Sequence, residues 1–297
     1  MKERTRLIDP ENVAEMARCI NWEEVLREVI GGLWPNVIET SPIKMVLDLG
    51  CGPGQWATTV AFEHPEIRVI GVDSLRERVQ YARECARVQM LANVTFTMMD
   101  VLHPPLAFPD GTFDLISGRF LSELLDRASW PQVLVECRRL LRPGGVLCLA
   151  EEEVSVSNSL ALQQIYRSLY RLRADERHTY AVDRYSVGIC PVLPGLLKQA
   201  GFCDVASRSF HLDSSAHAPL HLALCQDLEI RLALLKPALL RTGIMEETEY
   251  EALHEQIQLD MRNEHFAQMA FGLQVWGSAP ARATTSAEAE RRELIAL

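Results

Sequence analysis

The sequence predicts an α/β fold, a doubly wound and mostly parallel sheet of seven strands with N-terminal helices and a helical cap. Five short apolar segments alternate with helical patterns between residues 44 and 151. Strands and helices that alternate at this spacing are typical of parallel sheets covered by helices on both faces. The first apolar segment runs directly into a glycine-rich turn, and sheets of this class bind ligands at such strand ends.

The elements of the first half follow in a regular order. Residues 9–33 carry apolar side chains at helical spacing and predict two short helices, the second capped by Asn21 and ended by Gly31-Gly32. We expect strands at 44–49, 68–72, 94–98, 112–117 and 146–151. Helices are expected between them at 55–63, 75–91 and 129–141.

Past residue 151 the alternation becomes irregular. Helical patterns at 158–174, 190–200, 216–241 and 246–262 flank two strand-like segments, 204–212 and 266–276. We interpret these two segments as the last strands of the sheet, with a helical cap inserted between them. The expected organisation is N-terminal helices at 1–36, the sheet domain at 37–212 and 265–278, a cap at 213–264 and a loose, polar tail at 279–297.

Composition narrows the classes of partner. The formal net charge is −10 and the pI is about 5.4, which argues against binding to nucleic acid or to an anionic membrane surface. Eight cysteines occur singly, as expected for reduced thiols in the cytoplasm. His217 and His221 lie four residues apart but lack a clear third ligand, so we expect no metal.

The glycine turn is Gly50-Cys51-Gly52-Pro53-Gly54. Glycines at such a turn let the backbone approach a ligand closely, although a plain tight turn between strand and helix is the alternative. The spacing is G-x-G-x-G, whereas the dinucleotide fingerprint needs G-x-G-x-x-G, and position 55 is glutamine. No Gly-Lys-Ser/Thr sequence follows, which excludes a phosphate-binding P-loop.

Polar residues end the next three strands. Asp73, followed by Ser74, ends the second strand about 20 residues past the glycines, where an acid accepts hydrogen bonds from ribose hydroxyls. Asp100 ends the third strand and Arg119 the fourth. Since parallel strands end at one edge of the sheet, these residues and the glycine turn converge on one crevice.

These motifs resemble those of the class I S-adenosylmethionine-dependent methyltransferases that act on small molecules. The first motif of that family matches Val46-Leu-Asp-Leu-Gly-Cys-Gly-Pro-Gly-Gln55, and Asp73 and Asp100-Val101 stand where the family has its ribose-binding acid and its adenine contacts. The later motifs match Phe108–Ile116 and Leu141–Val146. The resemblance covers roughly residues 40–153 and, more weakly, Leu193–Phe202.

The resemblance implies the sheet order, an antiparallel last strand and a set of cofactor contacts. Gly50, Gly52, Gly54 and Asp48 are expected at the methionine and ribose portions of S-adenosylmethionine, Asp73 and Ser74 at the ribose, and Asp100 and Val101 at the adenine. Arg119 is expected near the sulfonium end, although an arginine beside a cationic sulfur is electrostatically unfavourable unless it reaches away. The expected products are a methylated acceptor and S-adenosylhomocysteine.

The acceptor and the catalytic residues are less defined by the sequence. Methyl transfer needs mainly alignment and exclusion of water, and a base only where the acceptor must lose a proton. Candidates for that base are His103, His178 and Tyr180, and of Glu151–Glu153 at most the first is expected to face the site. We expect a small, secondary-metabolite acceptor and a monomer or homodimer. A methyltransferase of protein or RNA, or a cofactor-binding protein without methyl transfer, remains open as an alternative.

Overall fold

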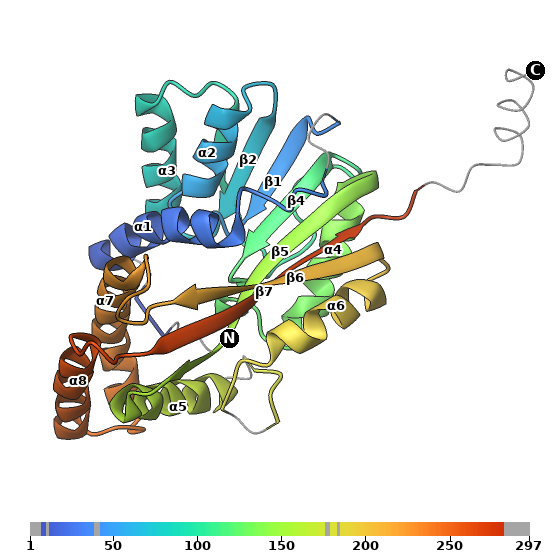
Figure 1. The fold of residues 1–297 in the computed structure, drawn as a ribbon. Helices are drawn as coiled ribbons and strands as arrows, with labels where there is room; N and C mark the ends of the chain where they lie inside the picture. Colours follow the sequence, from blue (N-terminus) through green and yellow to red (C-terminus); the bar gives the residue numbers. More distant parts are fainter. Residues whose placement is uncertain (1–6, 10–11, 39–41, 176–178, 183–184, 282–297) are drawn as a thin grey trace, which may run out of the picture.

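The computed structural model describes residues 7–9, 12–38, 42–175, 179–182 and 185–281, and a seven-stranded sheet forms their centre (Figure 1). Its order is β3-β2-β1-β4-β5-β7-β6. The strands are β1 (Met45–Leu49), β2 (Arg68–Asp73), β3 (Val94–Met98), β4 (Phe113–Arg119), β5 (Leu141–Ser157), β6 (Cys203–Asp213) and β7 (Gln268–Ser278).

Strand direction agrees with the predicted doubly wound sheet. The pairs β1–β2, β2–β3, β1–β4 and β4–β5 are parallel, whereas β7 is antiparallel to both β5 and β6. The carboxyl ends of the first four strands therefore meet at one edge of the sheet. The expectation of seven strands with the last one antiparallel is confirmed.

Alternate residues of the strands pack into two apolar cores, one on each face of the sheet. Val46 and Leu115 pack in a core with apolar side chains of α2 (Gln55–Glu63) and α3 (Arg76–Val88). Leu47 and Ile116 face the opposite side and pack with α4 (Ser129–Leu140) and α6 (Ile189–Gln199). Burial on both faces explains why these strands read as continuous apolar runs in the sequence.

The N-terminal segment forms one helix, α1 (Val13–Ile30), so the prediction of two short helices was wrong. Asn12 caps the helix, its side-chain oxygen accepting a hydrogen bond from the Ala14 amide at 2.8 Å, and Gly31 ends it in a left-handed conformation. Asn21 lies exposed in the middle of the helix. The helical hydrogen bonding continues through Asn21 because an exposed asparagine inside a helix lowers the stability of the helix only slightly.

Three helices lie against the far ends of β5, β6 and β7 and share a third apolar core (Figure 1). They are α5 (Leu160–Asp175), α7 (His221–Arg241) and α8 (Glu247–Met261), of which α7 and α8 lie between β6 and β7 in the sequence. Figure 1 shows α1 between this group and the α2–α3 pair. The domain limits given above stay predictions, and the tail from 282 onward lies outside the described residues.

Candidate functional site

The glycine turn after β1 is built around positions that only glycine occupies without strain. Gly50, Gly52 and Gly54 have φ values of +64°, +54° and +84°. A Cβ atom on Gly54 would lie 2.7 Å from the Ala82 Cβ and 2.8 Å from the Phe96 ring. The turn therefore brings backbone, rather than side chains, to the carboxyl edge of the sheet.

Asp73 ties this turn to the end of β2. Its side chain is 5% exposed, and its Oδ2 atom accepts a hydrogen bond from the Gly52 amide at 3.0 Å. Its Oδ1 atom accepts one from the Leu75 amide at 2.9 Å. Each carboxylate oxygen can accept a further hydrogen bond, so Asp73 positions the loop and keeps capacity for a ligand. The structure thus brings together the first two features that the sequence singled out.

Asp48 lies under the turn with an unsatisfied oxygen. The residue is 1% exposed, and its Oδ2 atom has no hydrogen-bond partner among the described residues. Burial raises its pKa to about 7, although the Arg119 guanidinium acts in the opposite direction. An unpaired buried carboxylate oxygen costs free energy unless a donor reaches it, and a bound ammonium group would supply that donor.

Asp100 and Val101 lie beyond the end of β3, next to β2. Asp100 accepts a hydrogen bond from the Leu102 amide at 2.9 Å, and its other oxygen lies 2.8 Å from the His103 Nδ1 atom. The Val101 side chain is buried, whereas the His103 ring is 68% exposed. Ser74 directly follows Asp73 at the same edge. His103 pairs with Asp100 and does not line the cavity beside the glycine turn that is described below, so its role as a base stays a prediction.

Arg119 points to the sheet face that α1 and α2 cover. Its guanidinium pairs with the Glu23 carboxylate and lies 5.3 Å from the centre of the Trp56 ring. These contacts hold Arg119 in an ion pair of low exposure, and it does not line the cavity beside the glycine turn. The predicted contact between Arg119 and the cofactor stays a prediction.

A cavity of about 160 Å³ adjoins the glycine turn. A Cβ atom on Gly50 would lie 3.5 Å from Leu124, and one on Gly52 would lie 3.9 Å from Arg78, both of which line the cavity. Its wall is mainly apolar and comes from the segment before α1, the loop after β4, and helices α5 and α7. The apolar residues include Leu7, Ile8, Phe120, Leu169, Val187, Leu228, Leu232 and Leu235, with Tyr166 and Tyr170 beside them.

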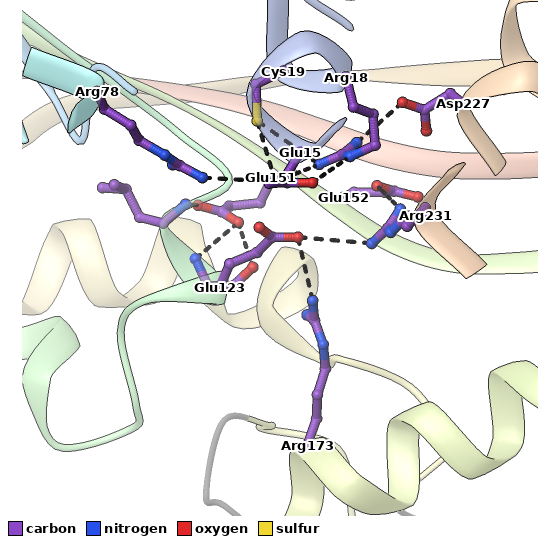
Figure 2. Close-up of polar contacts among 12 residues, drawn as sticks. Glu15, Arg18, Cys19, Arg78, Glu123, Glu151, Glu152, Arg173, Asp227 and Arg231 are labelled. Atoms are coloured by element: carbon purple, nitrogen blue, oxygen red, sulfur yellow. Dashed lines mark hydrogen bonds and ion pairs between the residues drawn. The ribbon is translucent and has the colours of Figure 1, made fainter. Parts of the chain in front are cut away.

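Four charged side chains form a polar group on the cavity wall, which we call the charged quartet: Glu123, Glu152, Arg173 and Arg231 (Figure 2). Glu123 lies 3.4 Å from Arg173 and 3.7 Å from Arg231, and Glu152 lies 3.5 Å from Arg231. Burial acts to raise the pKa of Glu123, but the two arginines outweigh it and the pKa is lowered. Burial raises the pKa of Glu152, with Arg231 opposing and Glu123 adding to the rise.

A second ion-pair network joins α1 to α7 beside the cavity (Figure 2). Arg18 pairs with Glu15 at 2.8 Å and with Asp227 at 3.1 Å, and its side chain is 8% exposed. Glu15 in turn lies 3.7 Å from Arg78, the α3 residue next to Gly52. The network therefore fixes the N-terminal helix over the crevice through charges on three elements.

The expectation for Glu151–Glu153 was wrong, because Glu152 and Glu153 line the cavity and Glu151 does not. Glu151 is fully buried and accepts hydrogen bonds from the Leu121 amide at 2.7 Å and the Ser122 hydroxyl at 2.7 Å. Burial raises its pKa to about 8 against the effect of these bonds. The cause of the difference is that β5 continues to Ser157 beside β7 with a register shift between Glu152 and Ser155, so the strict alternation of side chains is interrupted there.

The catalytic roles of Tyr180 and His178 stay predictions. The Tyr180 hydroxyl donates a hydrogen bond to the Arg127 carbonyl at 3.3 Å, and the ring lies under the Arg127 guanidinium outside the cavity lining. His178 lies outside the described residues. The sequence reasoning missed the charged quartet, although Asp227 and Arg231 stand four apart in the apolar run of α7 and offered a signal.

The described residues give no helix that is long and apolar enough to cross a membrane. Strand order, the antiparallel β7, the glycine turn after β1 and the acids after β2 and β3 together define the class I methyltransferase fold. The YcgJ protein from Bacillus subtilis has the same fold, with a TM-score of 0.53 and 17% identity over 88% of this chain and 100% of that chain.

The family follows from the sequence of the same region. Residues 46–145 match the sequence profile of a methyltransferase domain. This match assigns a methyltransferase domain to residues 46–145.

Relatives extend the match beyond this domain to different degrees. A demethylmenaquinone methyltransferase from Geobacillus kaustophilus is 27% identical over 213 residues, which are 67% of this chain and 84% of that protein. A methyltransferase of Schizosaccharomyces pombe is 35% identical over 37% of this chain, and an uncharacterised 37.1 kDa transposon protein of Streptomyces fradiae is 38% identical over 48% of it. The chain spans about two fifths of the length of these last two, 40% and 39%.

Proposed function

We propose that this protein transfers the methyl group of S-adenosylmethionine to a small-molecule acceptor. The observation that carries this proposal is a largely apolar cavity placed directly against the glycine turn of a methyltransferase domain. Methyl transfer is an in-line displacement, so the protein must align the acceptor with the methyl group and exclude water. A cavity with residues of α1 and α7 in its wall suits both tasks.

The residues at the turn fit the cofactor. The unpaired Asp48 oxygen suits its ammonium group, and Asp73 keeps the capacity to accept hydrogen bonds from ribose hydroxyls. Gly50, Gly52 and Gly54 present backbone where side chains would otherwise intrude. When bound, the cofactor supplies an activated methyl group on a sulfonium. We assign Ser74, Asp100 and Val101 to its ribose and adenine end on the strength of the family resemblance.

A small acceptor is favoured over a macromolecule by the shape and charge of the site. The cavity is roofed by ion-paired helices, whereas a protein or RNA substrate needs an open groove. The net charge of −10 also disfavours RNA. A relative whose name gives a small-molecule acceptor, demethylmenaquinone, supports this assignment. A secondary-metabolite acceptor, a cytoplasmic location and a monomeric or dimeric state remain proposals that rest on the sequence alone.

The test is calorimetry of the purified protein with S-adenosylmethionine and S-adenosylhomocysteine. Asp73→Ala should weaken both affinities at least about 100-fold, because it removes the ribose acceptor and the anchor of the Gly52 amide. Asp110→Ala is the matched control, since Asp110 is 79% exposed and lies on the surface. Failure of the folded wild type to bind either compound would refute the proposed function.

A further inference from the structure

The charged quartet on the cavity wall is balanced within itself. Two carboxylates, Glu123 and Glu152, face two guanidinium groups, Arg173 and Arg231, at 3.4–3.7 Å (Figure 2). These distances are long for ion pairs with direct hydrogen bonds, so the groups neutralise one another without saturating their hydrogen-bonding capacity. The charged quartet therefore carries no excess charge of its own but does have free acceptor atoms. The other charged groups on the wall are Glu15 and Arg78, which pair with each other, and Glu153, which is bonded to two backbone amides.

Glu152 is the carboxylate on this wall with the most freedom to bind a ligand. Its side chain is 17% exposed and makes no hydrogen bond to another described residue, its single ion pair being the one to Arg231. Glu153 is already bonded to the Gly188 and Cys190 amides at 2.6 Å and 3.1 Å. Glu15 is bonded to Arg18. Glu123 accepts a hydrogen bond from Arg173 at 3.4 Å. Of the four acidic residues that line the cavity, Glu152 is thus the only one without a hydrogen bond to another described residue.

The position of Glu152 places it beside the reacting end of the crevice. Ala150 pairs with Arg119 at the end of β4, and Glu152 lies two residues farther along β5. Phe120, which follows β4, donates its amide to the Ala150 carbonyl and lines the same cavity. Ligands of open α/β sheets bind at the carboxyl ends of the strands, so the Glu152 carboxylate lies near the position expected for an acceptor.

The remaining cavity wall suits one aromatic ring. Tyr166 and Tyr170 stack with ring centres 6.2 Å apart, and Phe120, Leu228 and Leu232 complete the apolar surface. Apolar cavities of about 150 Å³ hold a benzene molecule, and this cavity measures about 160 Å³. The volume therefore admits a single substituted ring.

Building on the proposed function, we propose that the acceptor is a neutral, single-ring aromatic molecule whose hydroxyl donates a hydrogen bond to Glu152. The apolar ring lies against α5 and α7, and the hydroxyl points to β5. A charged acceptor beside Glu152 would add an unbalanced charge to a quartet whose own charges cancel, and burying such a charge is costly. The charged quartet thus selects against both acids and amines.

The same hydrogen bond directs the proton during methyl transfer. The hydroxyl oxygen forms the bond to the methyl carbon as the carbon–sulfur bond breaks, and the electron pair of that bond stays on sulfur. The hydroxyl proton passes to the Glu152 carboxylate and from there to solvent. No further reactant is required. The neutral hydroxyl becomes an ether, the ionised carboxylate becomes a carboxylic acid, and the sulfonium becomes a thioether.

The surroundings of Glu152 determine its response to pH. Arg231 and Asp227 face it from α7, Glu123 from the loop after β4, and Arg173, Tyr166 and Tyr170 from α5. Burial raises its pKa, and Arg231 limits the rise. Protonation of Glu152 as the pH falls removes the charged acceptor, so binding of the neutral phenol should weaken on the acidic side.

Selectivity is tested by binding to protein saturated with S-adenosylhomocysteine, using three molecules of similar shape. They are para-ethylphenol, which is neutral, para-hydroxyphenylacetate, which is anionic, and tyramine, which is cationic. We expect para-ethylphenol to bind at least about tenfold more tightly than either charged analogue. A smaller ratio, or no binding of para-ethylphenol, would overturn the proposed acceptor class.

The role of Glu152 is tested with Glu152→Gln, and Glu264→Gln serves as the control because Glu264 is 78% exposed and distant from the cavity lining. Loss of the charge-assisted hydrogen bond should weaken para-ethylphenol binding at least about tenfold. Because burial raises the pKa of Glu152, the affinity of the wild type and the control should fall as the pH is lowered, and that of Glu152→Gln should stay constant. Identical pH profiles would overturn the assignment.

Turnover of para-ethylphenol tests the proton transfer. We expect Glu152→Gln to retain less than about a tenth of the wild-type kcat at saturating para-ethylphenol, in addition to its weaker binding. A larger residual kcat, or no turnover by wild type that binds both compounds, would overturn this step. Unchanged S-adenosylhomocysteine affinity in the variant shows that it is folded, and absence of that affinity in the wild type would instead refute the proposed function.

Discussion

Gly54→Ala separates the two reasons why the turn after β1 needs glycine. The backbone at this position has φ +84°, and a Cβ atom there would lie 2.7 Å from Ala82 and 2.8 Å from the Phe96 ring. The left-handed conformation costs a residue with a Cβ atom about 1–2 kcal/mol. Overpacking a close contact adds about 1–3 kcal/mol. We expect Gly54→Ala to lower the free energy of unfolding by about 2–5 kcal/mol.

Gly144→Ala provides a matched control. Gly144 has φ +77°, but a Cβ atom on it would meet no atom within 4 Å. Only the conformational cost applies there, so the loss should be about 1–2 kcal/mol. Urea unfolding at constant m-value measures both losses, and calorimetry should show weaker S-adenosylhomocysteine binding for Gly54→Ala alone. Losses that agree within about 0.5 kcal/mol would refute the argument from close packing.

Two further predictions concern buried charges. Burial raises the Glu151 pKa from 4.5 to about 8, so the folded protein keeps a proton that the unfolded chain loses, and stability falls as the pH rises through this interval. Glu151→Gln should flatten that fall in urea titrations from about pH 5 to pH 8, and parallel curves for both proteins would contradict it. Arg18→Met removes the cation that pairs directly with both Glu15 and Asp227, leaves Glu15 only the longer pair with Arg78, and should cost about 3–5 kcal/mol. Arg87→Met at an exposed pair should cost less than about 1 kcal/mol, and equal losses would count against the buried network.

Local residue patterns were sufficient to predict most of the fold from the sequence. The β1, β2 and β3 strands, the α2 helix and the glycine turn were predicted closely, because each combines a strong apolar run with a glycine or acidic terminus. The prediction of two short helices in place of α1 was wrong because it too relied on a local signal, a possible capping residue. Asn21 is a good capping residue, but Asn12 already caps the helix and the Asn21 side chain faces solvent.

The cavity could not be predicted in this way, because its wall is assembled from distant segments. Glu152 faces the cavity since β7 pairs with β5 far past Glu151, a contact that residue patterns near 151 do not reveal. Arg231 reaches the wall from α7, and Arg173 does so from α5. The sequence signal for charged groups at this wall was the presence of Asp227 and Arg231 in an apolar helix, because charged side chains on a buried helix face require ion-pair or hydrogen-bond partners.

The ion pair between Arg18 and Asp227 joins residues that stand 209 positions apart in the chain. Closing so long a loop carries a large entropic cost that short-range contacts do not bear. The sheet from β1 to β5 can therefore gain its contacts first, and the cavity closes when α7 reaches α1. The part of the sheet that holds the glycine turn thus depends on contacts of shorter sequence separation than the contact that closes the cavity.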